Sequence, residues 1–314
     1  MSQRISFLPL GVHPVIYSLF NANGELDRQA MKRQIEVCVS QGAVGIVALG
    51  LATEVRFLDQ KKQRQIVEWS VADIAGRVPL GVTIFAQTPE KMIERVHQAK
   101  IAGADWVILQ PPANVTDAQV LQKVFSRTLE ECHLPAALQN MPQFIGVGLT
   151  VKMIAELAKR HDNLVAVKQE VSAIEIAELI LQLGGHAQVL SGRGGIELVD
   201  CMAAGVSGHI PAPEYADILV RLWDSMKAGR ESEAKEIYAR FLPLATFILQ
   251  SVDSLTTYGK LLFCLRNGID FYQRTGADKP TRFGLDLLMA HAQWAGIQTG
   301  EWAVHFASIL ENEK

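Results

Sequence analysis

The chain has 314 residues, of which 49% are hydrophobic and 20% charged, and its formal net charge is −3. A chain of this length and composition has enough apolar residues for one large core of roughly 250 residues with an appendage. The small negative charge provides no basic field for nucleic acid or anionic lipid, so neither is an expected partner. No apolar segment reaches the ~20 residues that a membrane span needs, and the N-terminus does not follow a basic region with an apolar one. We therefore expect a cytoplasmic protein.

The four cysteines, Cys38, Cys132, Cys201 and Cys264, lie far apart in the sequence. None belongs to a Cys-x-x-Cys pair or has the Cys/His spacing that is typical of a zinc site. In a cytoplasmic protein, cysteines with such spacing are reduced thiols in the core. We expect neither a disulfide nor a metal, and no cofactor.

Short apolar runs alternate with longer amphipathic segments along most of the chain, which is the pattern of βα units around a parallel sheet. The runs with the length and composition of strands are 15–18, 45–49, 79–85, 106–109, 136–139, 164–168, 188–191 and 208–211. Eight units of this kind close a (β/α)8 barrel. The predicted fold class is therefore α/β, a (β/α)8 TIM barrel.

The segments between these runs support the prediction. In the segment 29–42, the residues Met31, Ile35 and Cys38 fall on one helical face and Gly42 ends the pattern. After about residue 214 the strand signals stop, while the helical period continues. We therefore predict a barrel over residues 1–225 and a C-terminal helical extension over residues 226–314.

The sixth predicted strand ends in a lysine, Lys168, within the stretch NLVAVKQE at 163–170. In TIM barrels the reacting groups project from the C-terminal ends of the strands. Among apolar neighbours the ammonium form is disfavoured, so the amine becomes a usable nucleophile that condenses with a carbonyl to give an iminium. The alternative is a structural ion pair, for example with Glu170. The position favours catalysis or ligand binding over that alternative.

Several ordered landmarks between about residues 11 and 270 resemble one known family. They are NANGELD at 21–27, GLATE at 50–54, AGADWVILQPP at 102–112, LQNMPQFIGVGL at 138–149, NLVAVKQE at 163–170 and GVSGHI at 205–210. Their order and spacing are similar to those of the dihydrodipicolinate synthase and N-acetylneuraminate lyase superfamily of pyruvate-dependent class I aldolases. The resemblance implies that Lys168 forms the imine, that the substrate is a small-molecule 2-oxo acid, and that the protein is a homotetramer.

The chain departs from this family at positions that bear on the substrate. Gln139 stands where the family has a proton-shuttling tyrosine, and an amide cannot act as a general acid or base near neutral pH. Leu51 and Ala52 replace a hydroxyl-bearing pair, and Phe144 replaces the arginine that binds a second carboxylate in the synthases. The stretch SGRGG at 191–195 lacks the acidic pair with which sialic acid lyases hold sugar hydroxyls. Neither a standard dihydrodipicolinate synthase nor a sialic acid lyase is expected.

The predicted pocket around Lys168 is more apolar than the resemblance alone would imply. Its expected lining residues are Leu51, Ala52, Gln139, Phe144, Gly194, His209, Ile210 and Pro211. The carboxylate of a 2-oxo acid is expected to bind the backbone N–H groups of residues 51–53, with the Thr53 hydroxyl helping, because amide groups need no particular side chain.

Another group must carry protons if Gln139 does not. His209, at the end of the eighth strand, is the first candidate, because an imidazole titrates near neutral pH; its alternative role is a hydrogen bond to a carbonyl at the barrel rim. Glu54 is the second candidate, with support of its own loop as the alternative, and an ordered water or the substrate itself could replace both. Arg193 is a candidate clamp for an anionic substrate, with surface solvation as the alternative.

The leading hypothesis is a lyase or hydro-lyase that acts through an imine between Lys168 and pyruvate or a substituted pyruvate. The loss of polar contacts favours an aldolase or hydratase–aldolase for aromatic or aliphatic substrates within that class. Two alternatives stay open: a barrel that binds a metabolite without turnover, and a phosphate-binding barrel enzyme that uses Lys168 only as a charge.

Overall fold

A closed ring of parallel strands forms the centre of the protein. The computed structural model describes residues 7–311. Its strands are β1 (Gly11–Val12), β2 (Ile46–Ala48), β3 (Leu80–Ile84), β4 (Trp106–Leu109), β5 (Ala136–Asn140), β6 (Leu164–Gln169), β7 (Gln188–Ser191) and β8 (Gly208–His209). They pair in the order β1-β8-β7-β6-β5-β4-β3-β2, and a parallel bridge between Val15 and Val47 joins the two ends of that order. The predicted TIM barrel is confirmed.

The first strand lies earlier than the predicted run 15–18. Gly11 and Val12 pair with β8, and the last ladder bond at this edge runs from the N–H of Ile16 to the carbonyl of Val47. The N–H of Tyr17 already donates to a side chain, that of Gln34 in the first helix. The prediction was shifted because it followed the apolar side chains, whereas the pairing begins at a glycine, which has no side chain to signal a strand.

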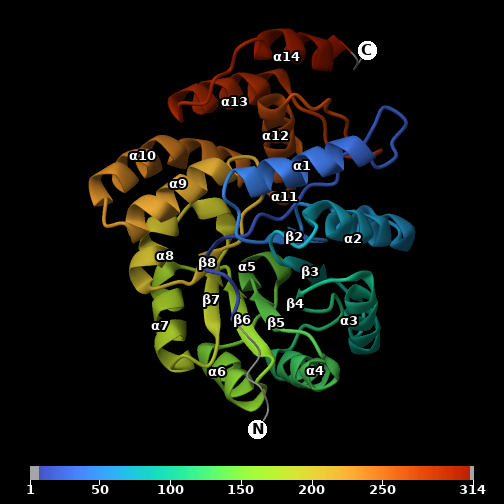
Figure 1. The fold of residues 1–314 in the computed structure, drawn as a ribbon, viewed down its shortest axis with the longest axis vertical. Helices are drawn as coiled ribbons and strands as arrows, with labels where there is room; N and C mark the ends of the chain where they lie inside the picture. The colour runs from blue at the N-terminus through green and yellow to red at the C-terminus, as the bar shows by residue number, and fades with distance from the viewer. Residues whose placement is uncertain (1–6, 312–314) are drawn as a thin grey trace.

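Helices cover the outside of the ring between successive strands (Figure 1). They are α1 (Arg28–Ser40), α2 (Gln60–Ile74), α3 (Pro89–Ala102), α4 (Ala118–Glu131), α6 (Val151–Arg160), α7 (Ala173–Leu183) and α8 (Leu198–Ala204). Helix α1 begins after Asp27, whose side chain accepts from two backbone N–H groups of the first turn. It buries Met31, Ile35 and Cys38 against the sheet, as its sequence period predicted.

The chain beyond β8 is helical, as predicted. Its helices are α9 (Ala216–Lys227), α10 (Glu231–Ile248), α11 (Val252–Ser254), the π-helical turn η3 (Leu255–Gly259), α12 (Lys260–Asn267), α13 (Arg282–Trp294) and α14 (Trp302–Glu311). Figure 1 shows α13 and α14 at the top of the molecule, far from α4 and α6. Helix α9 packs against both β1 and α10, so the division at residue 225 stays a prediction.

All four cysteines are buried and unpaired, which confirms the expectation of reduced thiols in the core. Within residues 7–311, no helix combines the length and the apolar character that crossing a membrane requires. In the same range, no three His, Cys, Asp or Glu side chains gather as ligands for a metal ion.

Candidate active site

Lys168 lies near the C-terminal end of β6, between β5 and β7. Side chains two residues apart on a strand share a face, so Lys168 and Glu170 point the same way. The Lys168 Nζ lies 2.8 Å from Glu170 Oε1, and the two side chains are only 11% and 8% exposed. The ion pair that the sequence offered as an alternative therefore forms, but it forms in the wall of a cavity and both residues line that cavity.

Gln139 reaches the same carboxylate from the neighbouring strand. It pairs in register with Lys168, and its Nε2 donates to Glu170 Oε1 over 2.8 Å. Gln139 is buried and does not line the cavity, so its predicted place in the lining is wrong. Both nitrogens approach Oε1 of Glu170, the lysine as an ion pair and the amide through a hydrogen bond. Gln139 therefore orients a carboxylate that the sequence analysis treated only as a structural partner.

Room for Glu170 depends on a glycine in the next strand connection. A Cβ on Gly192 would lie 2.5 Å from Glu170 Cγ and 2.8 Å from its Cδ. We expect Gly192→Ala to displace the carboxylate and to lower turnover at least tenfold with little loss of thermal stability. Steady-state kinetics and a thermal melt of the variant check this.

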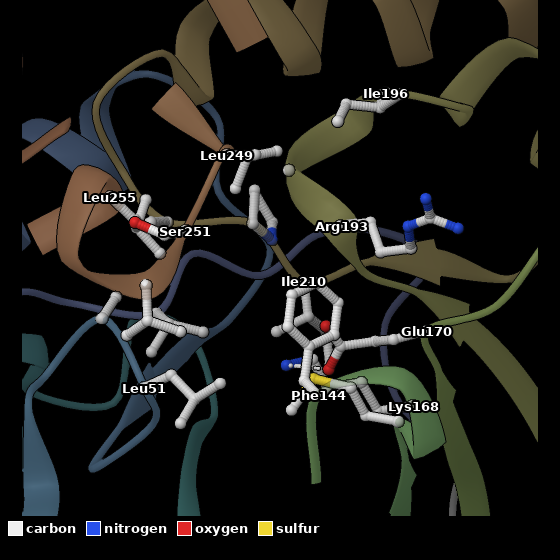
Figure 2. A pocket seen from close by; sticks show the side chains of 17 residues that line it. Leu51, Phe144, Lys168, Glu170, Arg193, Ile196, Ile210, Leu249, Ser251 and Leu255 are labelled. Carbon is white, nitrogen blue, oxygen red and sulfur yellow. Dashed lines mark ion pairs between the residues drawn. The ribbon is translucent and has the colours of Figure 1, made fainter. Parts of the chain in front are cut away.

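Most predicted binding residues do meet around this cavity. Those that line it are Leu51, Ala52, Phe144, Lys168, Arg193, Gly194, Ile210 and Pro211. The lining residues that the sequence analysis missed are Val15, Met141, Glu170, Ile196 and Ala212, together with Leu249, Ser251, Val252 and Leu255 from the C-terminal extension. Figure 2 shows the Lys168–Glu170 ion pair close to Phe144 on one side, with Leu51 and Leu255 across the cavity.

The loop after β2 offers backbone groups but no hydroxyl to the cavity. Thr53 is fully buried, does not line the cavity, and donates its hydroxyl to the carbonyl of Ile16 over 2.6 Å. The expectation that this hydroxyl helps to hold a carboxylate is therefore wrong. The N–H groups of Leu51 and Ala52 have no acceptor among the described residues, so they remain available to an anion.

His209 does not reach the cavity either. Its ring is fully buried, its Nδ1 lies 2.9 Å from the hydroxyl of Ser191, and it is not among the lining residues. Burial, followed by the nearby Lys168 charge, lowers the pKa of His209 to about 3. The imidazole is therefore neutral at physiological pH and lies outside the cavity lining, so the structure does not favour it as the proton carrier.

The two other charged candidates are engaged in ion pairs. Arg193 Nη1 lies 3.0 Å from Glu197 Oε1, and both side chains are 25% exposed. Glu54 is buried away from the cavity, where its Oε2 accepts from Lys260 and its Oε1 accepts from Arg274 over 2.8 Å. Glu54 thus anchors its loop to the C-terminal extension, which is the supporting role that was its alternative.

The comparison with known proteins gives the family. The sequence profile of the Dihydrodipicolinate synthetase family matches residues 8–258. The chain belongs to this family. It is accordingly a lyase of the class I aldolase type, as predicted, and the family's action on pyruvate fits a site built around a buried lysine.

Relatives and solved structures agree with the profile of the dihydrodipicolinate synthetase family. The chain is 28% identical over 229 residues to the 4-hydroxy-tetrahydrodipicolinate synthase of Pelobacter propionicus, covering 71% of this chain and 78% of that one. The synthase of Methanocaldococcus jannaschii is 30% identical over 240 residues, covering 74% and 81%. A crystal structure from Pseudomonas aeruginosa, described as a putative dihydrodipicolinate synthetase, superposes with a TM-score of 0.85 at 23% identity, covering 91% of this chain and 99% of that one.

A further buried carboxyl group, that of Glu214, lies in the segment between β8 and α9. It is almost fully buried and accepts from the Tyr17 hydroxyl over 2.7 Å. Burial raises the pKa of Glu214 from 4.5 to about 7, although the Tyr17 hydrogen bond opposes the shift. The folded state therefore keeps a proton that the unfolded chain loses, and stability falls as the pH rises from about 4.5 to about 7.

We expect the free energy of unfolding of the unmodified protein to fall by about 3 kcal/mol over that pH window relative to Glu214→Gln, which carries no titrating group. Urea unfolding of both proteins at several pH values measures the difference. Parallel stability curves for the two proteins would contradict the raised pKa.

Proposed function

We propose that Lys168 forms an imine with a 2-oxo acid, pyruvate or a substituted pyruvate, and that Glu170 moves the protons of the subsequent lyase or hydro-lyase step. The observation that carries this proposal is the contact of 2.8 Å between Lys168 Nζ and Glu170 Oε1 in the wall of a cavity. A general acid–base must lie within hydrogen-bond reach of the proton that it transfers, and Glu170 meets that condition for the amine.

Imine formation needs a neutral amine and a route for one proton. Glu170 accepts a proton from the Lys168 ammonium, and the free amine adds to C2 of the 2-oxo acid. The oxygen on C2 takes one proton from the nitrogen and one returned by Glu170, and then leaves as water. The product is an iminium between Nζ and C2, which draws electrons from C3.

The same carboxylate serves either continuation from the iminium. In a retro-aldol cleavage it removes the proton of a hydroxyl on C4, the C3–C4 bond breaks, its electron pair forms an enamine, and C4 leaves as an aldehyde. Glu170 then returns the proton to C3, and water hydrolyses the imine. In a dehydration Glu170 removes a proton from C3, and the C4 hydroxyl leaves with that proton as water.

Substrate anchoring is assigned to the loop after β2. The N–H groups of Leu51 and Ala52 are proposed to bind the carboxylate next to C2, because they lie at the cavity and have no acceptor among residues 7–311. Arg193 is proposed only as a rim residue, since its guanidinium is paired with Glu197. Gly194 and Ile210 complete the wall near the lysine.

We infer further that the reaction is not standard dihydrodipicolinate synthesis or sialic acid cleavage. Gln139 has no ionisable proton to shuttle, and Phe144 is apolar at the place where the synthases are expected to bind a second carboxylate. Relatives named 4-hydroxy-tetrahydrodipicolinate synthase establish kinship, and these two side chains argue for a different second substrate. The homotetramer and the cytoplasmic location stay predictions.

Borohydride trapping tests the imine. With pyruvate present, reduction followed by peptide mass spectrometry should leave an adduct on Lys168 and on no other lysine. Lys168→Arg keeps the positive charge beside Glu170 but cannot form an imine, so it should give no adduct. If no 2-oxo acid of a panel leaves an adduct on the enzyme, the proposed imine is wrong, and Lys168 then acts as a simple charge.

A further inference from the structure

The two ends of the cavity differ in chemistry. At the strand end lie Lys168 and Glu170, whereas the C-terminal extension contributes Leu249, Val252 and Leu255 to the lining, and we call these three side chains the distal wall. Figure 2 shows Leu249 and Leu255 across the cavity from Lys168. Every member of the distal wall is a hydrocarbon side chain. The one polar side chain from the extension in this lining is that of Ser251.

The extension delivers this wall through an unusual turn. Helix α10 ends at Ile248, and Leu249 follows it into the cavity. Ser251 caps α11, with its hydroxyl oxygen accepting from the N–H of Ser254 over 2.9 Å. The π-helical turn η3 then begins at Leu255, and a π-helical turn changes the direction of the side chains that it carries. The Ser251 oxygen is thus used in capping and its O–H remains a donor, while the other lining side chains of this segment are apolar.

Buried ion pairing fixes the distal wall in place before any ligand binds. Glu54, which follows the loop of Leu51, accepts from Lys260, the first residue of α12 after η3. These side chains are 2% and 0% exposed, and Arg274 binds the other oxygen of Glu54. The loop on one side of the wall and the helical segment on the other are therefore held together by the same contacts, so the compartment is pre-formed.

We propose that the distal wall is a subsite for an apolar substituent, alkyl or aryl, on the carbon chain of the 2-oxo acid beyond C3. The inference rests on the proposed imine function and names its substrate class. A hydroxylated chain would meet one polar side chain of the extension, Ser251, and hydrocarbon elsewhere along the distal wall, and each unpartnered hydroxyl is unfavourable there. Within residues 7–311 no cationic side chain belongs to the distal wall, and Arg193, elsewhere in the lining, is already paired with Glu197, so a second carboxylate finds no unpaired cation there.

The test compares the concentrations of pyruvate and 2-oxohexanoate that give half-maximal borohydride adduct on Lys168. Burial of one methylene strengthens binding roughly fourfold, so the three additional methylenes should lower the half-saturating concentration at least tenfold. The ratio of the half-saturating concentration of pyruvate to that of 2-oxohexanoate should fall to about three in Leu255→Asn, because the variant places an amide against the alkyl chain of the ligand. The half-saturating concentration of pyruvate itself should stay within about twofold of its value in the unmodified protein. Leu181→Asn, on an exposed position of α7, is the matched control and should change neither value.

Each outcome decides the matter. Equal half-saturation by the two acids in the unmodified protein overturns the subsite and leaves the imine function standing, whereas no adduct with either acid overturns both. A Leu255→Asn variant that weakens both acids equally also overturns the subsite. Should Leu255→Asn fail to fold, as judged by circular dichroism, Leu255→Ala takes its place and must still lower the ratio at least threefold.

Discussion

Replacing Glu170 with glutamine is expected to lower proton transfer at C3 of pyruvate by about 10²- to 10⁴-fold. Imine formation should also slow, because it uses the same carboxylate, but the Lys168 adduct can still be trapped after a long incubation with pyruvate. The glutamine side chain has nearly the same shape and can still accept from Lys168 and Gln139, so the lysine keeps its place. It cannot take up a proton near neutral pH. Of the groups that line the cavity, the Glu170 carboxylate is the one bound to the lysine nitrogen at 2.8 Å.

The measurement needs no knowledge of the second substrate. An iminium of pyruvate that loses a C3 proton and regains one from solvent exchanges its methyl hydrogens for deuterium in D2O, which proton NMR follows directly. Glu197→Gln is the matched control, since that carboxylate lies 3.0 Å from Arg193 and does not line the cavity. It should leave the exchange rate within about twofold. Exchange at an undiminished rate in Glu170→Gln, with borohydride trapping intact, would assign the proton to another group.

The barrel was predictable because its signals are local. A strand buried on both faces reads as a short apolar run, and a covering helix such as α1 shows its period in thirteen residues. Lys168 was found for the same reason, since an ammonium at the end of such a run stands out. The first strand was predicted too late in the chain, because Gly11 has no side chain to indicate a strand, although its backbone pairs with β8.

The chemistry around Lys168 was less readable, because it depends on contacts between distant residues. Glu170 was visible only as a neighbour two positions away, and nothing local indicated that Gln139 would hold it or that Gly192 would leave it room. His209 looked like a base at a strand end, but burial makes its charged form unfavourable. A side chain's place in the sequence does not report how dry its surroundings are.

The distal wall shows most clearly that contacts between distant residues cannot be predicted from local sequence. Leu249 and Leu255 lie about 80 residues beyond Lys168 along the chain, in a segment whose helical period predicted only packing. The Glu54–Lys260 contact joins the helical segment after these residues to the loop of Leu51, and the sequence shows a lysine in a helix and a glutamate in a loop without any sign that they meet. Tertiary packing, and not local propensity, assembles this half of the site.

The Glu54–Lys260 contact predicts a large stability effect. Lys260 is completely buried beneath the Phe20 ring and paired with Glu54, and burial lowers the pKa of Lys260 while the Glu54 charge opposes that shift. Lys260→Met should reduce the free energy of unfolding by about 3–5 kcal/mol, because it leaves a buried carboxylate with Arg274 as its remaining cation.

Urea unfolding of Lys260→Met measures this effect, and Lys91→Met is the control. The Lys91–Glu94 pair is about half exposed, so its loss should change the free energy of unfolding by less than about 1 kcal/mol. The double variant Glu54→Gln with Lys260→Met should recover part of the loss, because it removes the orphaned charge along with the lysine. Half-saturation by pyruvate in Lys260→Met should also rise, as the N–H groups of Leu51 and Ala52 lose their anchor. If Lys260→Met is as stable as Lys91→Met, packing alone holds the loop of Leu51 and the C-terminal extension together. The Glu54–Lys260 ion pair would then not be what pre-forms the distal wall.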